Sequence, residues 1–198
     1  MLTLNEPFDH EGRYYSLRRA FTAVKPLQQP YPPIFFGGSS EGALAMGAEH
    51  CDVFALYGEP LKETAERIAD FRQRAARHGR VPKFNISFRP ILGATEGQAW
   101  DKAKKALKDL EGVGFSTAPQ DASARRLLEI AARGETHDER LWMPIAQATG
   151  AKGNTSCLVG TAEQVAEAML KYYRLGVDSF LIRGFDPVGD VSAFGEEL

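Results

Sequence analysis

Short apolar segments and amphipathic helical patterns alternate along most of this chain. Apolar segments lie at 34–36, 51–57, 83–92 and 178–185. Short apolar runs bounded by turn residues are typical of strands in parallel α/β sheets, which are buried on both faces. Strands that alternate with helices form parallel sheets through right-handed crossovers. The alternation therefore predicts an α/β fold with four β/α units. Four units are half of a TIM-barrel-like (β/α)8 fold, and a four-stranded open sheet is the simpler alternative.

The helical patterns lie at 41–49, 59–78, 96–110 and 161–176. In the second pattern, apolar residues recur at helical spacing between charged ones, at Leu61, Ala65, Ile68, Phe71 and Ala75. The last pattern begins with Thr161 and Gln164, whose spacing is typical of a capping box. Before the first strand, the sequence of residues 1–31 predicts an N-terminal segment that contains a small hairpin around Glu11-Gly12 and an extended proline-rich stretch.

Residues 111–156 form an irregular insertion before the last predicted strand. Glycines and prolines interrupt two helical pieces, near 121–133 and 138–148. An insertion of this length within a compact domain is more often functional than inert. We predict that it has few buried contacts, is mobile without ligand and closes over the site as a lid. Proteases are then expected to cleave near Arg125, Arg126 or Arg133.

The composition predicts one globular domain over residues 1–198. Hydrophobic residues make up 43% and charged residues 25%, and a net charge of −2 gives no reason to expect nucleic acid or a membrane as a partner. No apolar run approaches the roughly 20 residues of a membrane span, and residues 1–7 do not resemble a signal peptide. Cys51 and Cys157 are far apart in the sequence, and we expect both to be buried free thiols. We therefore expect a cytoplasmic protein.

The stretch Gly37-Gly38-Ser39-Ser40 separates the first predicted strand from the first predicted helix. Glycine lets the backbone approach a ligand closely, and Ser39 or Ser40 can cap the helix. A helix N-terminus with free N–H groups and hydroxyls binds phosphate readily. The alternative is a junction in which glycine and serine only end the strand. Such junctions outnumber phosphate sites, so the spacing alone favours this alternative.

Three segments of the chain resemble the bacterial luciferase-like flavin-dependent monooxygenases, and the alkanesulfonate monooxygenase branch most of all. They are Pro32–Ser40, Gly160–Ala166 and Phe180–Phe185, and the resemblance extends from about residue 5 to the end. It implies that the chain corresponds to the C-terminal half of the family's (β/α)8 barrel. Its four strands would then be the fifth to the eighth, and the last helix is expected to be cut off at Leu198.

The resemblance also implies a function. Gly38, Ser39 and Ser40 would hold the phosphate of reduced FMN (FMNH2). A flavin reductase would supply this reduced FMN. The reduced flavin would react with O2 and oxygenate a small organic substrate, such as an organosulfur compound. Other family positions differ here. A histidine of the seventh strand is replaced by Arg89, an arginine by Ser87 and a tyrosine by Phe185. These differences leave the substrate open.

Arg89 and Arg183 are the candidate substrate-binding residues, because both lie on strands near the ends where barrel active sites form. Each can bind an anionic substrate group or the flavin phosphate. The equally weighted alternative is a structural ion pair with Asp52, Asp178 or Asp186. The four histidines show no metal-ligand spacing, and no residue is identified as a general acid or base, so catalytic residues stay unassigned.

Two other functions remain open from the sequence. One is a deazaflavin (F420)-dependent oxidoreductase of the same superfamily, and the other is a truncated, non-catalytic flavin-binding protein. A half-barrel would expose two unpaired strand edges and its apolar interior. We therefore expect the chain to self-associate as a homo-oligomer, to swap elements or to require the missing half.

Overall fold

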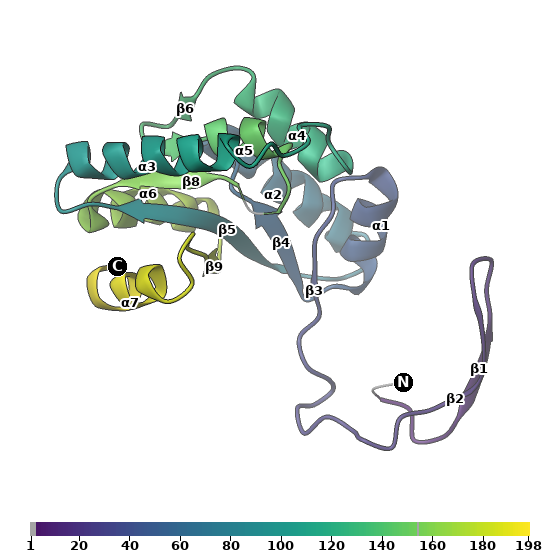
Figure 1. The fold of residues 1–198 in the computed structure, drawn as a ribbon. Helices are drawn as coiled ribbons and strands as arrows, with labels where there is room; N and C mark the ends of the chain where they lie inside the picture. The colour runs from purple at the N-terminus through teal and green to yellow at the C-terminus, as the bar shows by residue number, and fades with distance from the viewer. Residues whose placement is uncertain (1–2, 154) are drawn as a thin grey trace. The chain divides into compact units, whose positions relative to one another are not determined.

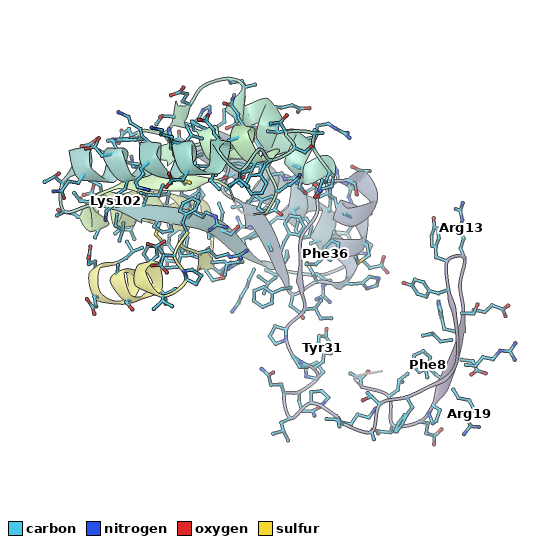
Figure 2. All side chains as sticks on the ribbon, viewed as in Figure 1. Phe8, Arg13, Arg19, Tyr31, Phe36 and Lys102 are labelled. Carbon is cyan, nitrogen blue, oxygen red and sulfur yellow. The ribbon has the colours of Figure 1, made fainter. Side chains whose placement is uncertain are left out.

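The computed structural model describes residues 3–153 and 155–198, which form two compact units (Figure 1). The first unit, Met1–Ile34, contains an antiparallel hairpin of β1 (Phe8–Glu11) and β2 (Ser16–Ala20). The Gly12 N–H donates to the Tyr15 carbonyl at 3.1 Å and closes the turn. Most side chains of the hairpin are exposed, including Arg13 and Arg19 (Figure 2). The predicted hairpin around Glu11-Gly12 is confirmed.

The second unit, Phe35–Leu198, contains four parallel strands that adjoin in sequence order. They are β3 (Phe35–Phe36), β4 (Val53–Tyr57), β5 (Lys83–Leu92) and β9 (Ser179–Ile182). A helix follows each strand: α1 (Glu41–His50), α2 (Leu61–Ala76), α3 (Glu96–Glu111) and α7 (Gly189–Glu197). A further helix, α6 (Ala162–Leu175), begins with the predicted capping box of Thr161 and Gln164 and precedes β9. The four β/α units predicted from the alternation are confirmed, and they form a half-barrel (Figure 1).

The two faces of β5 differ in chemistry. Phe84, Ile86 and Phe88 are fully buried in the main core, toward the helices. From α2, Phe71 stacks on Phe54 with ring centroids 3.8 Å apart and meets Phe84 edge-on. The alternate residues of β5 face the inside of the half-barrel. The strand register places them beside the inward-facing positions of β4 and β9. The sheet therefore buries an apolar face and presents a more polar one to the barrel interior.

The inserted segment forms an additional layer. It contains α4 (Ala122–Ala131), β6 (Thr136–His137), β7 (Leu141–Trp142) and α5 (Pro144–Thr149), and it leads into β8 (Cys157–Gly160). β8 runs parallel to the second half of β5, and β7 pairs with β8 in the antiparallel direction. The long strand β5 thus serves both the half-barrel and the added layer. Its first half pairs with β4 and β9, and its second half with β8.

The expectation that the whole insertion has few buried contacts is wrong. Ala124, Leu127, Ile130 and Ala131 of α4 are buried in the main core, because α4 is an amphipathic helix whose apolar stripe faces inward. Only residues 111–120 are exposed throughout, and from 115 onward they form no regular element before α4. Within the described part of the insertion, we therefore expect this loop to be mobile.

We expect limited proteolysis to distinguish this loop from α4. Chymotrypsin should cleave the native protein after the exposed Phe115, whereas trypsin should spare the bonds after Arg125 and Arg126, which lie within α4. Mass spectrometry of the early fragments provides the measurement. Tryptic cleavage within α4 as fast as chymotryptic cleavage at Phe115 would show that α4 opens with the loop.

None of the helices in the described ranges is both long and apolar enough to cross a membrane.

Candidate functional site

The turn between β3 and α1 is held close to its neighbours. The Ser40 hydroxyl caps α1 by accepting from the Ala43 N–H at 3.3 Å. A Cβ added to Gly38 would lie 2.7 Å from the Ala43 Cβ, and one added to Gly37 would lie 3.0 Å from the Ala55 carbonyl oxygen. Glycine is needed here because the turn lies so close to α1 and β4. Of the two predicted capping serines, Ser40 is the cap, which leaves the Ser39 side chain for other contacts.

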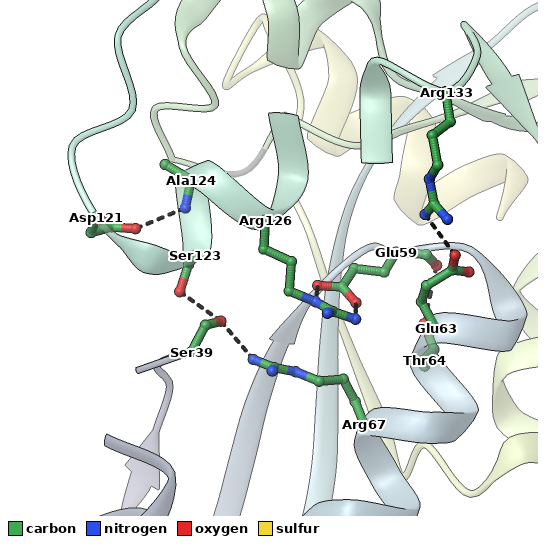
Figure 3. A network of polar contacts seen from close by, with 10 residues as sticks. All are labelled: Ser39, Glu59, Glu63, Thr64, Arg67, Asp121, Ser123, Ala124, Arg126 and Arg133. Atoms are coloured by element: carbon green, nitrogen blue, oxygen red, sulfur yellow. Dashed lines mark hydrogen bonds and ion pairs between the residues drawn. The ribbon is translucent and has the colours of Figure 1, made fainter. Parts of the chain in front are cut away.

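Three elements meet at the Ser39 hydroxyl (Figure 3). Nη2 of Arg67, from α2, donates to Ser39 Oγ at 2.5 Å, and the Ser123 hydroxyl, from the first turn of α4, donates to it at 3.0 Å. Burial lowers the pKa of Arg67, the nearby Glu59 carboxylate opposes this effect, and the nearby cation of Arg126 adds to it. No carboxylate among the described residues lies within ion-pair distance of the Arg67 guanidinium. A largely desolvated cation therefore points at the glycine–serine turn.

The neighbouring cation, Arg126, has its own counter-charge. Its Nε and Nη2 donate to the two carboxylate oxygens of Glu59 at 2.7 and 2.8 Å, a bidentate pair (Figure 3). This bond raises the pKa of Arg126. Glu59 is only 6% exposed, and its carbonyl accepts from the Tyr172 hydroxyl at 2.9 Å. The pair connects α4 to the carboxyl end of β4, and Arg67 is left without an ion pair of its own among the described residues.

A cavity of about 540 Å³ lies in front of this group. The glycine–serine turn, Glu59, Arg67 and the first residues of α4 line one part of it, and Asn85, Ser87 and Leu181 from the barrel interior line another. Asp121 caps α4 by accepting from the Ala124 N–H at 2.8 Å, so the N-termini of both α1 and α4 border the cavity. Helix N-termini carry partial positive charge. On one side the cavity thus combines the Arg67 cation and two helix N-termini with the Glu59 and Asp121 carboxylates, and on the other side it has a mixed polar and apolar surface.

The two arginines predicted to bind substrate lie elsewhere, at the carboxyl ends of β5 and β9. Arg89 is half-buried, donates to the Gly184 carbonyl and lies 4.8 Å from the centre of the Phe185 ring. Burial lowers its pKa, as does the nearby positive charge of Arg183, which is itself exposed. The structure brings these two cations together, but neither lines the 540 Å³ cavity.

The three acids proposed as structural partners for these arginines all have other contacts. Asp52 pairs with Arg80 at 2.7 Å. The Asp178 carboxylate accepts from the Phe84 N–H at 2.8 Å, and the Asp186 carboxylate accepts from the Val188 N–H at 3.0 Å.

The sequence profile described as luciferase-like monooxygenase matches residues 1–179. This chain belongs to the luciferase-like monooxygenase family. The family expected from three sequence segments is therefore confirmed, whereas its alkanesulfonate branch stays a prediction.

Solved structures of similar fold agree with this membership. DmoA from Hyphomicrobium sulfonivorans is 20% identical with a TM-score of 0.70, and the match covers 98% of this chain and 46% of DmoA. Riboflavin lyase (RcaE) is 21% identical with a TM-score of 0.69, covering 96% and 47%. An F420-dependent secondary alcohol dehydrogenase is 14% identical with a TM-score of 0.65, covering 100% and 56%. This luciferase-like chain thus spans about half the length of the structures it matches.

Three residues of the candidate site were missed by the sequence analysis: Glu59, Arg67 and Ser123. Glu59 had a usable signal, since it comes directly after the strand segment closed by Gly58, at the end where parallel sheets bind ligands. Arg67 stands beside the buried Ile68 on α2, but a cation there is hard to distinguish from one on the solvated face. Ser123 lies in the insertion and had no sequence signal.

Proposed function

We propose that Gly38, Ser39 and Ser40 bind the phosphate of reduced FMN, and that the chain forms the phosphate-binding half of an FMNH2-dependent monooxygenase. The observation that carries this proposal is the guanidinium of Arg67, which is partly desolvated, has no carboxylate of the described residues at ion-pair distance and donates to Ser39. A phosphate group would provide the missing negative charge. It would also accept hydrogen bonds from the N–H groups at the start of α1.

The residues present fit a phosphate monoester. The turn has no side chain at positions 37 and 38, and two hydroxyls, Ser39 and Ser123, lie next to the guanidinium. The Glu59–Arg126 pair balances its own charge and positions α4, and Asp121 adds a carboxylate to the cavity lining, so Arg67 is the cation that faces the turn. Reduced flavin would supply the reaction with O2, and the chain's own residues would bind it, orient it and exclude water. We assign no catalytic acid or base.

We propose that Arg89 and Arg183 bind an anionic group of a small organic substrate, for which an organosulfur compound is one candidate. Both arginines lie at the carboxyl ends of neighbouring strands, where barrel enzymes place their active sites. A flavin reductase would be the source of FMNH2. Cys51 and Cys157 are free and buried, which supports a reducing compartment such as the cytoplasm.

The second candidate is an F420-dependent oxidoreductase, which the fold similarity to the F420-dependent secondary alcohol dehydrogenase favours. Titration with both cofactors distinguishes the two. Preference for F420, with no oxygen uptake when FMNH2 is supplied, would favour this second function. Binding of FMN without oxygen uptake under any condition would instead favour a non-catalytic flavin-binding protein.

We expect the double variant Ser39→Ala, Ser40→Ala to bind FMN at least tenfold more weakly, because a hydrogen bond to a charged group such as phosphate contributes about 1.5–3 kcal/mol. Quenching of flavin fluorescence measures the affinity. Thr95→Ala is a matched control, since Thr95 caps α3 as Ser40 caps α1 but does not line the cavity. The Thr95→Ala variant should lose about as much folding stability as removal of the Ser40 cap costs, and it should bind FMN with wild-type affinity. Equal FMN affinity in the wild type and the double variant would remove the phosphate assignment.

A further inference from the structure

The loop that follows β9 is held on both sides of a single peptide group. The Gly184 carbonyl accepts from Nη1 of Arg89, which lies in the second half of β5. The N–H of the same peptide group, on Phe185, donates to Oδ2 of Asp190 at 2.6 Å, and the Asp186 N–H donates to the same oxygen at 2.9 Å. The Gly184–Phe185 peptide group therefore lies between the Arg89 cation and the Asp190 carboxylate.

The loop packs tightly around this contact. Gly184 approaches α7 so closely that a Cβ at this position would overlap the Asp190 side chain. Asp190 lies in the first turn of α7, where the partial positive charge of the helix N-terminus also favours a carboxylate. On the other side, the Arg89 guanidinium lies 4.8 Å from the centre of the Phe185 ring. Arg89 thus contacts a carbonyl and a ring whose positions both depend on the loop that Asp190 holds.

A peptide group that is hydrogen-bonded at both ends connects its two partners. A carboxylate that accepts from the N–H polarises the group, and the carbonyl oxygen becomes a stronger acceptor. Hydrogen bonds to charged groups are also stronger than bonds between neutral groups, and a charged group takes part at each end here. The orientation of the carbonyl that accepts from Arg89 therefore depends on Asp190.

We propose that Asp190 is a positioning residue for Arg89. Through the Gly184–Phe185 peptide group and the Phe185 ring, Asp190 holds the guanidinium at the carboxyl ends of β5 and β9. This is the orientation in which Arg89 would bind the anionic group of a substrate. The consequence for substrate binding rests on the proposed function of Arg89, whereas the positioning itself does not.

The charge of Asp190 and its hydrogen bonds have opposite effects on an anion at Arg89. Burial and the Arg183 cation lower the pKa of Arg89, and the Cys157 thiol and the Asp190 carboxylate oppose this, so Asp190 also acts on Arg89 through space. Removing a negative charge near an anion site should by itself strengthen anion binding. Asp190→Asn removes the charge and keeps an oxygen for the two N–H groups, whereas Asp190→Ala removes both.

Labelling of arginine with phenylglyoxal measures the positioning without any substrate. Digestion of the labelled full chain and mass spectrometry give the reaction rate at each arginine. In Asp190→Ala, Arg89 should react about tenfold faster than in the wild type, because the loss of a net hydrogen bond frees the guanidinium. In Asp190→Asn, Arg89 should react at close to the wild-type rate. Arg67, on α2, is the internal reference and should react at one rate in all of these proteins.

Asp186→Ala is the matched control, because the Asp186 carboxylate accepts from the Val188 N–H in the same loop. It should leave the rate at Arg89 unchanged. The positioning role would be overturned by a wild-type rate at Arg89 in Asp190→Ala, or by an equal rise at Arg67, which would indicate general loosening. Equal rates at Arg89 in the alanine and asparagine variants would also overturn it.

Calorimetric titration with methanesulfonate, a small organic anion, measures the consequence for binding. Asp190→Ala should bind this probe about tenfold more weakly than the wild type, again the effect of one net hydrogen bond, and Asp190→Asn at least as tightly. Tighter binding in both variants would contradict the proposal, since charge alone would then explain the result. A wild-type chain that does not bind methanesulfonate would contradict the proposed function of Arg89, and the labelling rates would still decide whether Asp190 positions it.

Discussion

Replacing Arg67 by methionine is expected to weaken FMN binding by about 100-fold. The guanidinium is the cation of the glycine–serine cluster that forms no ion pair with a carboxylate among the described residues. A charge-assisted hydrogen bond to phosphate in a partly desolvated site contributes up to about 3 kcal/mol. Methionine keeps much of the aliphatic volume, and removing a desolvated cation should not lower stability. Fluorescence titration with FMN and a thermal melt measure the two effects separately.

Arg72→Met is the matched control for this prediction. Arg72 lies on the same helix, and its guanidinium stacks 5.2 Å from the centre of the Phe84 ring, away from the turn. The Arg72 variant should bind FMN like the wild type. Unchanged affinity in the Arg67 variant, or an equal loss in both variants, would contradict the role of Arg67.

Replacing Glu59 by alanine is expected to lower the free energy of unfolding by about 3 kcal/mol. The change leaves the Arg126 guanidinium without its bidentate partner, near a second desolvated cation, Arg67. Removing one partner of a buried ion pair is strongly destabilising for this reason. The bonds from the Tyr172 and Thr64 hydroxyls go to the Glu59 backbone carbonyl and should persist. Urea denaturation gives the free energy.

A double-mutant cycle with Arg126→Met identifies the cause. If the cost comes from an unpaired cation, the double variant should be more stable than the sum of the two single losses implies. Additive losses, or a loss below about 1 kcal/mol in Glu59→Ala, would show that the pair does not hold α4 to the end of β4.

Much of the fold could be predicted from the sequence because its signals are local. A strand such as β4 is a short apolar run ended by Gly58, and α2 shows its core-facing stripe within one segment. The role of β8 was harder to predict, because it pairs with Arg89–Leu92, far earlier in the chain. The burial of α4 was missed for a related reason. Glycines and prolines around it indicated an irregular segment, but its apolar stripe packs into the main core.

The candidate site likewise combines residues that could be predicted from a local sequence pattern with residues that only the tertiary packing brings together. Gly38, Ser39 and Ser40 form one local turn, so glycine and hydroxyl chemistry at a helix start were visible in the sequence. Arg67 and Ser123 reach Ser39 only through the packing of α2 and α4, at sequence separations of 28 and 84 residues. A single sequence does not show which of its many arginines will be desolvated beside a turn. The cation that we propose to bind phosphate at this turn therefore emerged only from the tertiary structure.

Comparing FMN with riboflavin on the wild-type chain tests the phosphate site most directly. The two ligands share the isoalloxazine ring and the ribityl chain and differ only in the terminal phosphate. If Arg67 and the turn bind that phosphate, FMN should bind about 100-fold more tightly than riboflavin, and the Arg67→Met variant should lose most of this difference. Equal affinity for FMN and riboflavin in the wild type, or no detectable binding of either, would contradict the assignment.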